Sequence, residues 1–234
     1  MPNANAASLR ALSRVERKKL DKLMRIKRAA RALFARKGFA ATTTREIAQA
    51  ADVGIGTVFV YAGSKQDLLV MIFREEAGRA VDTAFETMPR APLIEQMLHV
   101  FGALLAHHER DPDLARVFVK ELPFVDDERH GRAAFMSDLF RRMAGLIDGA
   151  RERGELRPDV PSALLARNLF ALYFGCLQEW LGAAGVSPAQ RDSSLRAALE
   201  LHLSGLRLSR SEVECQQERV SNSSPGSAAR AKSG

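Results

Sequence analysis

Several hallmarks of other protein classes are missing from this chain of 234 residues. Its apolar stretches are broken by charges or glycine well before the roughly 20 residues that a membrane span needs. Residues 1–12 lack the charged-then-apolar layout of a secretory signal. The two cysteines, Cys176 and Cys215, form no close-spaced metal motif and no disulfide scaffold, although their number allows one disulfide. We therefore expect a cytoplasmic protein with no membrane partner, no metal and no cofactor.

Signals for β-strands and for enzyme active sites are equally scarce. Aromatic residues make up 6% of the chain, runs of alternating Val, Ile and Thr are missing, and there is no Asn-Gly pair. The one Asp-Gly pair, at 148–149, lies inside a stretch of helical periodicity and does not indicate a hairpin turn. The sequence also contains no Gly-rich phosphate loop, no Gly-x-Ser-x-Gly elbow and no Cys/His metal spacing. These absences predict an all-α protein and argue against an enzyme.

What is present is helical periodicity along most of the chain. The first helix is predicted to begin near Arg14 or Leu20 and to end at Lys37, where Gly38 provides a C-terminal cap. Further long helices are predicted over residues 64–88, 92–110, 113–122, 127–153, 161–182 and 188–208. From residue 209 onward the chain is rich in Ser, Gly, Gln and Arg, which predicts a disordered tail.

The positive charge is confined to the first third of the chain. Residues 1–70 carry 14 Lys and Arg against 5 Asp and Glu, a net charge of +9, whereas residues 71–234 carry 21 against 23, a net charge of −2. A basic module joined to a nearly neutral one suggests a polyanionic partner for the first part. The alternative is a basic surface that serves only solubility.

Residues 43–61 are predicted to form two short helices joined by a tight turn. Thr43 with Glu46 three residues later has the spacing of a capping box, and Asp52 stands where the backbone must turn sharply. Gly54 begins the second short helix, in which Val53 and Val58 have the spacing to pack inward. Such a helix-turn-helix presents the outward side chains of its second helix to the DNA major groove. The outward candidates are Ile55, Thr57, Phe59 and Val60, with Gly56 permitting close approach.

The residues around this motif resemble a known family. The pattern Gly38-Phe39-x-x-Thr42-Thr43-x-x-x-Ile47-Ala48-x-x-Ala51-x-Val53-x-x-Gly56-Thr57-Val58-Phe59-x-Tyr61-x-x-x-Lys65-x-x-Leu68 is similar to the DNA-binding domain of the tetracycline-repressor (TetR) family. The similarity runs from about Met24 to Leu69 without a gap. Residues 154–159, followed by the helix that ends at Trp180 and Leu181, also resemble the C-terminal half of this family. The resemblance implies a dimeric, all-helical transcriptional regulator with an N-terminal three-helix DNA-binding domain.

The resemblance also implies roles for single residues. Arg45 would reach a base edge, Thr57 would contact a base, and Ile55 and Phe59 could touch thymine methyl groups. Thr44, Tyr61 and Lys65 would bind phosphates and so set the register on DNA. Each has a structural alternative: Thr43 is above all a helix cap, Phe59 could be packing, and Arg45 and Lys65 could be solvated charges. The full candidate DNA-binding set is Thr43, Thr44, Arg45, Gly54, Ile55, Gly56, Thr57, Phe59, Val60, Tyr61 and Lys65.

Four positions depart from the usual pattern of the family. Asp52 replaces a usual Gly, Gly54 replaces Ser or Thr, Phe59 replaces Tyr, and Ala62 stands where Phe is frequent. Phe59 lacks the hydroxyl that often bonds a phosphate, and Asp52 places a negative charge near the DNA. The loss of a capping hydroxyl at Gly54 costs only a few tenths, roughly, of a kcal/mol. None of these changes breaks the motif.

The second half is expected to bind a small effector molecule and to dimerise. The last two helices carry broad apolar surfaces, and pairing them between two subunits would give a four-helix bundle, although part of this surface must be intrachain core. The middle helices would hold a pocket for an apolar or neutral ligand, which would tilt the helix that begins at Ser64 and release a repressor from its operator. The candidate pocket residues, for which plain core is the alternative, are Met97, Phe101, Leu104, Phe118, Phe124, Phe135, Met136, Leu139, Phe170, Tyr173 and Gln178.

These arguments divide the chain into four parts. We expect a basic extension (1–19), a helix-turn-helix domain (20–66), a helical ligand-binding and dimerisation domain (67–208) and the tail (209–234). The partners would be a double-stranded DNA operator, a second copy of the chain and a small-molecule effector. His107 and His108 are interpreted as solvated charges at a helix end rather than metal ligands. The competing functions are a helical protein-interaction module and a transcriptional activator.

Overall fold

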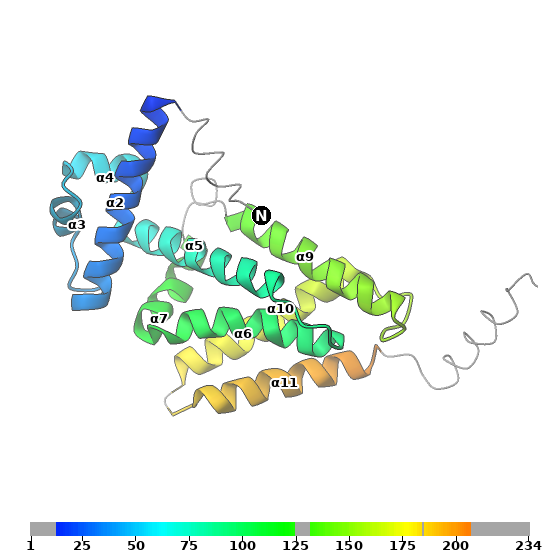
Figure 1. Cartoon of the computed structure of the whole chain (residues 1–234). Helices are drawn as coiled ribbons and strands as arrows, with labels where there is room; N and C mark the ends of the chain where they lie inside the picture. Colours follow the sequence, from blue (N-terminus) through cyan, green and yellow to red (C-terminus); the bar gives the residue numbers. More distant parts are fainter. Residues whose placement is uncertain (1–12, 125–131, 184, 207–234) are drawn as a thin grey trace, which may run out of the picture.

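The computed structural model describes residues 13–124, 132–183 and 185–206, apart from the side chains of Phe124 and Arg132. These residues form helices and no strands, in a small N-terminal unit and a larger helical bundle (Figure 1), which confirms the predicted all-α class and its two-part arrangement. No helix in these ranges is long and apolar enough to cross a membrane. The elements are α2 (Arg14–Lys37), α3 (Thr44–Ala50), α4 (Ile55–Tyr61), α5 (Lys65–Glu86), α6 (Leu93–Glu109), α7 (Pro112–Glu121), the 3-10 turn η1 (Leu122–Phe124), α9 (Arg132–Glu152), α10 (Ser162–Gly182) and α11 (Pro188–Ser204).

The local signals at the helix ends act as expected. Thr43 and Glu46 form the predicted capping box at the start of α3, and the Ser64 side chain accepts a hydrogen bond from the Asp67 amide at the start of α5. Gly38 ends α2 with φ of 81°, and Asp52 has φ of 53° in the turn between α3 and α4. Both positive φ values lie where side chains with a Cβ are disfavoured, and Asp is among the residues that tolerate them. Ser13 and Glu16 form a second capping box, which explains why α2 begins at Arg14.

Several predicted boundaries differ from the structure. The helix predicted over 64–88 ends at Glu86, and the helix predicted to reach residue 208 ends at Ser204. Beyond Ser204 the Leu206 carbonyl accepts a hydrogen bond from the Arg157 amide (2.9 Å), so a tertiary contact engages the backbone just beyond the helix. The predicted start of the 127–153 helix, residues 1–12 of the extension, Cys215 and the tail 209–234 lie outside the described residues.

α5 is the element that both units share. Six consecutive residues near its start, 68–73, are buried, so the helix is apolar all round at this level rather than on one face. The reason is that α5 packs against α2 on one side and against α6 and α7 on others. Fully burying one such side chain contributes about 1.5–3 kcal/mol. Ile26, Phe34, Ile47 and Val58 of the N-terminal unit are buried in the same hydrophobic core as this segment of α5.

The segment 154–159, which resembles the family pattern, is a structural joint. The Glu155 carboxylate accepts a hydrogen bond from the Leu93 amide (2.7 Å) at the start of α6, where the preceding Pro92 makes no side-chain cap hydrogen bond. A carboxylate at this position also complements the positive end of the helix dipole. Gly154 turns the chain with φ of 75°, and Leu156 is buried. This segment therefore ties the start of α6 and the end of α11 to the connection between α9 and α10.

α11 is held to α6 by charges as well as by leucines. Arg191 is 3% exposed; it pairs with Glu109 of α6 (3.3 Å) and Asp192 (2.8 Å) and lies over the Trp180 ring at 4.5 Å. Because the Glu109 and Asp192 carboxylates are both exposed, solvent screens these pairs and each contributes less than a fully buried pair would. The sequence pattern predicts only an apolar surface on this helix and does not reveal the ionic contact, because Arg191 and Glu109 are far apart in sequence.

Candidate nucleic-acid interface and ligand cavity

The second short helix, α4, presents apolar side chains to solvent. Ile55, Phe59 and Val60 are 43%, 47% and 76% exposed, whereas Val58 on the opposite face is completely buried. The predicted inward orientation of Val58 is thus confirmed, and Val53 is partly buried against the same core. Gly56 is exposed, and a Cβ built there would meet no atom within 4 Å, so this side of α4 is open to an approaching surface. Thr57 is half-buried beside the exposed residues.

The residues of α3 divide into a cap and an exposed cation. Thr43 uses its hydroxyl within the capping box, where it donates to the Glu46 carboxylate (2.8 Å) and accepts from the Glu46 amide (3.3 Å). Lys37 and Thr43 together lower the pKa of Glu46 to about 2, which keeps this carboxylate ionised. Arg45 is exposed and has no ion pair within the described residues, while Thr44 is half-buried. Thr43 is therefore a cap in this structure, and Arg45 is available to a ligand outside the chain.

Lys65 and Tyr61 make contacts within the protein. The Lys65 ammonium donates to the carbonyls of Phe39 (2.9 Å), Ala40 (3.1 Å) and Thr42 (3.0 Å), and it lies 4.5 Å from the centroid of the Phe39 ring. Because an ammonium has three N–H donors, these carbonyls engage all of them. The Tyr61 hydroxyl donates to the Lys19 carbonyl (3.0 Å). Both residues stabilise the N-terminal unit, and their predicted phosphate contacts would require these bonds to be shared or exchanged.

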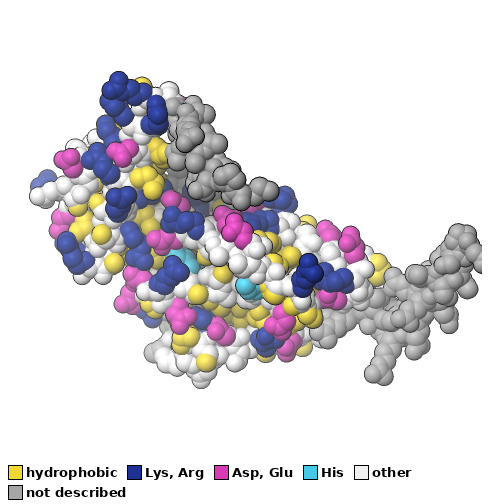
Figure 2. All heavy atoms as spheres, viewed as in Figure 1, with side chains coloured by type: hydrophobic (Ala, Val, Ile, Leu, Met, Phe, Trp, Pro, Cys, Tyr) yellow, Lys and Arg dark blue, Asp and Glu magenta, His cyan; other side chains and the backbone are white. Residues whose placement is uncertain are grey.

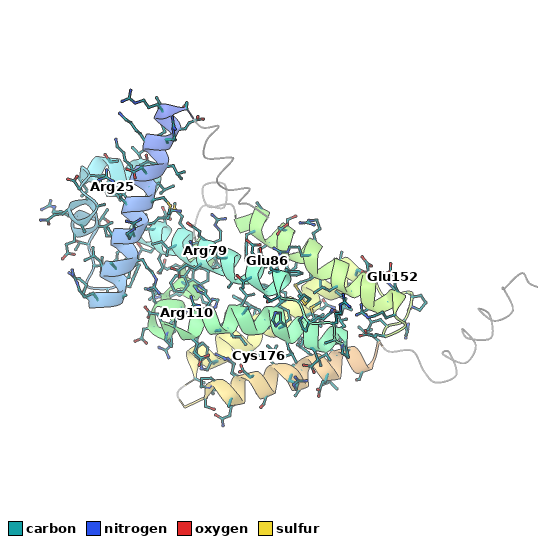
Figure 3. All side chains as sticks on the ribbon, in the orientation of Figure 1. Arg25, Arg79, Glu86, Arg110, Glu152 and Cys176 are labelled. Carbon is teal, nitrogen blue, oxygen red and sulfur yellow. The ribbon has the colours of Figure 1, made fainter. Side chains whose placement is uncertain are left out.

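Basic side chains surround the short helices. Figure 2 shows Lys and Arg atoms gathered along α2 and beside α3 and α4, whereas the rest of the visible face mixes both charges. Arg25, labelled in Figure 3 on α2, lies 3.5 Å from the carboxylate of Asp52 and 3.4 Å from that of Asp21. The negative charge that Asp52 introduces near the short helices is therefore partly neutralised by a neighbouring cation.

A cavity of about 280 Å³ lies among α5, α6, α7, α9 and α10. Most of its walls are apolar and a few polar side chains reach into it, which is the usual composition of a ligand site. Its walls are Val70, Arg74, Ala77, Leu104, His108, Phe118, Leu122, Phe135, Met136, Phe170, Tyr173, Phe174 and Leu177.

The predicted pocket residues are only partly brought together. Leu104, Phe118, Phe135, Met136, Phe170 and Tyr173 line the cavity. Met97, Phe101 and Leu139 are instead packed in the core, Gln178 is exposed, and the side chain of Phe124 lies outside the described residues. Arg74 and His108 were missed because charged and polar residues were assigned to the surface. Their helical spacing from Val70 and Leu104, four residues in each case, was the signal that pointed to the same face.

Polar side chains connect the cavity region to the N-terminal unit. Arg31 of α2 pairs with Glu76 of α5 (3.3 Å) and with Asp111 at the start of α7 (3.4 Å). Nδ1 of His107 lies 3.7 Å from the other Glu76 oxygen, and the His107 ring packs at 5.1 Å against that of His108. The interpretation of both histidines as solvated was wrong, since each is 4% exposed. Their helix is covered by α5 and α7, which the local sequence could not indicate.

The comparisons with known proteins agree with this geometry. The sequence model of the family described as "Bacterial regulatory proteins, tetR family" matches residues 26–72, which cover the second half of α2, all of α3 and α4, and the start of α5. The chain is 27% identical to the HTH-type transcriptional repressor KstR of Rhodococcus jostii over 161 residues (69% of this chain, 73% of that protein). It is 24% identical to the fatty acid metabolism regulator protein of Bacillus subtilis over 193 residues (81% and 98%).

Among solved structures, the chain is similar to Thermus thermophilus FadR, a TetR-family transcriptional repressor whose crystal structure was determined in complex with lauroyl-CoA. The sequence identity is 30%, the TM-score is 0.66, and the similarity covers 80% of this chain and 96% of that one. Because it spans nearly the whole of that chain, the likeness includes the helical bundle as well as the short helices.

The exposed cation of α3 provides a first prediction. If Arg45 reads a guanine, Arg45→Ala should lose about 1–3 kcal/mol of discrimination between the preferred duplex and one with that base pair changed. The measurement is the affinity for both duplexes at one fixed salt concentration. Equal weakening on specific and random DNA would instead assign Arg45 to a phosphate.

The buried imidazole of His107 provides a second prediction. Burial, with smaller contributions from the nearby charges, lowers the pKa of His107 to about 3 from its ordinary value of 6.5. Below pH 6.5 the unfolded chain therefore takes up a proton that the folded chain does not, so stability falls as the pH falls from 6.5 towards 3. One unit below pH 6.5 this contribution is about 1.4 kcal/mol.

Replacing His107 with leucine should remove that contribution. We expect His107→Leu to lose about 1.4 kcal/mol less stability than the native protein between pH 7.5 and pH 5.5, as measured by urea unfolding at both pH values. At pH 7.5 the variant should be no less stable, because neither nitrogen of His107 has a hydrogen-bond partner within the described residues. Identical acid losses in the two proteins would show that His107 protonates in the folded state.

Proposed function

Because the chain belongs to the tetR family of DNA-binding transcriptional regulators, we propose that it is a dimeric repressor that a small molecule releases from its operator. The single observation that carries the proposal is one helix, α5, that packs against α2 of the DNA-binding unit and also forms a wall of the cavity. A ligand in the cavity would thus touch the helix that holds the DNA-binding unit.

α4 is proposed to enter the major groove. Its exposed Ile55 and Phe59 would contact thymine methyl groups, Val60 would extend this apolar surface, and Thr57 would contact a base edge. The open backbone at Gly54 and Gly56 allows the helix to approach the bases closely. Arg45 of α3 would reach a second base, while Thr44, and Tyr61 and Lys65 where their intramolecular bonds permit, would bind phosphates.

The dimer is proposed to form through α10 and α11. Large apolar side chains that remain exposed in the described residues fall into two groups, one on the N-terminal unit and one formed by Leu164 of α10 and Leu201 of α11, which are 56% and 78% exposed. Ala171 and Gly175 are also exposed on α10, so a second helix could approach its backbone closely. A second copy of the chain would bury this surface and bring two recognition helices onto neighbouring half-sites.

Ligand release is proposed to act through α5. A molecule in the cavity would press on Val70, Arg74 and Ala77. These residues lie at the same level of α5 as Glu75 and Glu76, which pair with α2. A tilt of α5 would be transmitted through Glu76 and Arg31, and it would change the separation of the two α4 helices in the dimer. The ligand can shift this equilibrium only by its different affinity for the two states.

The ligand class is proposed to be a molecule with an extended apolar part, and a fatty acyl group is the leading example. Aromatic and aliphatic side chains make up most of the cavity wall. An apolar cavity of about 150 Å³ holds a benzene ring, so a volume of about 280 Å³ suits a longer hydrocarbon segment. The similarity to a repressor that was crystallised with lauroyl-CoA supports this choice.

The dimer can be tested with a charge placed on its proposed interface. Leu201→Glu should convert the protein from dimer to monomer in sedimentation velocity and should weaken operator binding at least about tenfold, because two linked half-site contacts become one. Ser137→Glu, which adds the same charge to an exposed position of α9, serves as the control and should change neither quantity. A Leu201→Glu protein that stays dimeric would exclude this interface.

Ligand release can be tested with lauroyl-CoA and an operator selected from a random pool of duplexes. We expect saturating lauroyl-CoA to weaken operator binding about 5- to 150-fold, the usual range for coupled sites, and the operator to weaken lauroyl-CoA binding by the same factor. Ala77→Phe, which places a ring in the cavity, should bind the operator but lose the response. Equal lauroyl-CoA affinity for free and operator-bound protein would rule out release by this ligand.

A further inference from the structure

Three polar side chains line the cavity, although an apolar ligand would need none of them. Arg74 comes from α5, His108 from α6 and Tyr173 from α10, so they reach the cavity from three different helices. Within the described residues Nε of Arg74 and Nε2 of His108 are buried without a hydrogen-bond partner. A purely hydrocarbon ligand would leave both nitrogens unsatisfied.

Arg74 differs from the other partly buried arginines of the bundle. Arg142, Arg151 and Arg191 each pair with a carboxylate, whereas Arg74 is half-buried with its Nε inaccessible and unpartnered. A guanidinium is always charged, and it forms its strongest hydrogen bonds with oxygens that carry negative charge. Arg74 has no such partner among the described residues, and the cavity is the space in which a ligand oxygen could reach it.

The carboxylates nearest to Arg74 in sequence are already engaged. Glu75 pairs with Lys27 and, at 3.6 Å, with Arg79, and Glu76 pairs with Arg31 at 3.3 Å. These contacts direct both carboxylates towards α2 and along α5 rather than to Arg74. The protein thus neutralises its own acidic groups at this level of α5 and leaves one cation at the cavity.

His108 offers the complementary group, an acceptor. Its Nδ1 lies 2.6 Å from the Leu104 carbonyl, and because a carbonyl only accepts, Nδ1 carries the proton and donates. In the neutral ring Nε2 is then an acceptor, and burial lowers the pKa of His108, which keeps the ring neutral at physiological pH. The side chain is 96% buried, wedged beside Phe73 and Phe118, and it lines the cavity.

We propose that the cavity recognises an acyl compound by its polar atoms: Arg74 binds the carboxylate or carbonyl oxygen, and Nε2 of His108 accepts a hydrogen bond from a donor on the ligand, such as a hydroxyl next to the acyl group. This inference rests on the proposed ligand-binding function and deepens it, because it replaces the expected apolar or neutral ligand with an amphiphile. The hydrocarbon chain lies along the aromatic wall, which includes Phe118 and Phe170.

The test compares laurate, 3-hydroxylaurate, lauroyl-CoA and 1-dodecanol by calorimetric titration of the full-length protein. Native protein should bind 3-hydroxylaurate more tightly than laurate, and both more tightly than dodecanol. Lauroyl-CoA and laurate share the acyl oxygen but not the free carboxylate, so their relative affinities identify whether a thioester or an acid is the better source of that oxygen. Dodecanol binding as tightly as laurate would overturn the proposal, and so would the absence of binding by every acyl probe.

Two variants separate the two polar contacts. Arg74→Met should weaken the binding of all acyl probes by about tenfold to hundredfold and should leave dodecanol unchanged, which is the expected effect of one charge-assisted hydrogen bond. His108→Phe, which keeps an aromatic ring between Phe73 and Phe118, should abolish only the preference for 3-hydroxylaurate, about fivefold. The control is Arg79→Met, an exposed arginine five residues along α5 (Figure 3) that does not line the cavity and should change no affinity.

Operator binding without ligand should be native-like in all three variants, which verifies that each has folded. An Arg74→Met protein that folds and binds laurate as tightly as the native protein would overturn the proposal. A different result would show that only the release mechanism is wrong. Laurate binding would then depend on Arg74, but no acyl probe would change the affinity for the operator. The recognition of the acyl oxygen by Arg74 would still be supported.

Discussion

The contact between Arg31 of α2 and Glu76 of α5 is the interaction on which the two-part structure depends. It joins the DNA-binding unit to the bundle at a half-buried site, where Asp111 holds the same guanidinium and His107 lies against the same carboxylate. An exposed ion pair is worth about 0–1 kcal/mol, but this group is shielded and shared among three helices and the start of a fourth. Figure 3 shows Arg110 at the adjoining end of α6, so the junction gathers charges from each element that meets there.

Apart from this junction, the apolar surfaces of the protein lie in separate places. The apolar residues of α5 between 68 and 73 are buried by both units and hold them together. Ile55, Phe59 and Val60 remain exposed at one end of the molecule, and Leu164 and Leu201 remain exposed on the last two helices. Between them the cavity leaves a further apolar surface that is not packed against other side chains. Under the proposed function, these three apolar surfaces would each take a different partner: DNA, a second subunit and a ligand.

Local signals predicted much of this arrangement and failed at specific points. The capping box at Thr43, the positive φ at Asp52 and the Gly38 cap depend on residues within a few positions of each other, and all were predicted correctly. Six of the candidate pocket residues do line the cavity, because helical spacing places them on one face. Met97 and Phe101 share that spacing but face α10 and the core, and Gln178 faces solvent. Periodicity identifies an inward face without saying what lies opposite to it.

The sequence by itself determined the fold class, the helix-turn-helix and the basic character of the first third, because these follow from spacing, capping and charge along the chain. The tertiary structure decided the roles of the long polar side chains. Lys65 binds three carbonyls of a distant loop, His107 is buried against Glu76, and Arg74 reaches a cavity instead of solvent. The physical reason is that a charged side chain extends several ångströms from its helix, so its partner is chosen by which elements pack beside it and not by its neighbours in sequence.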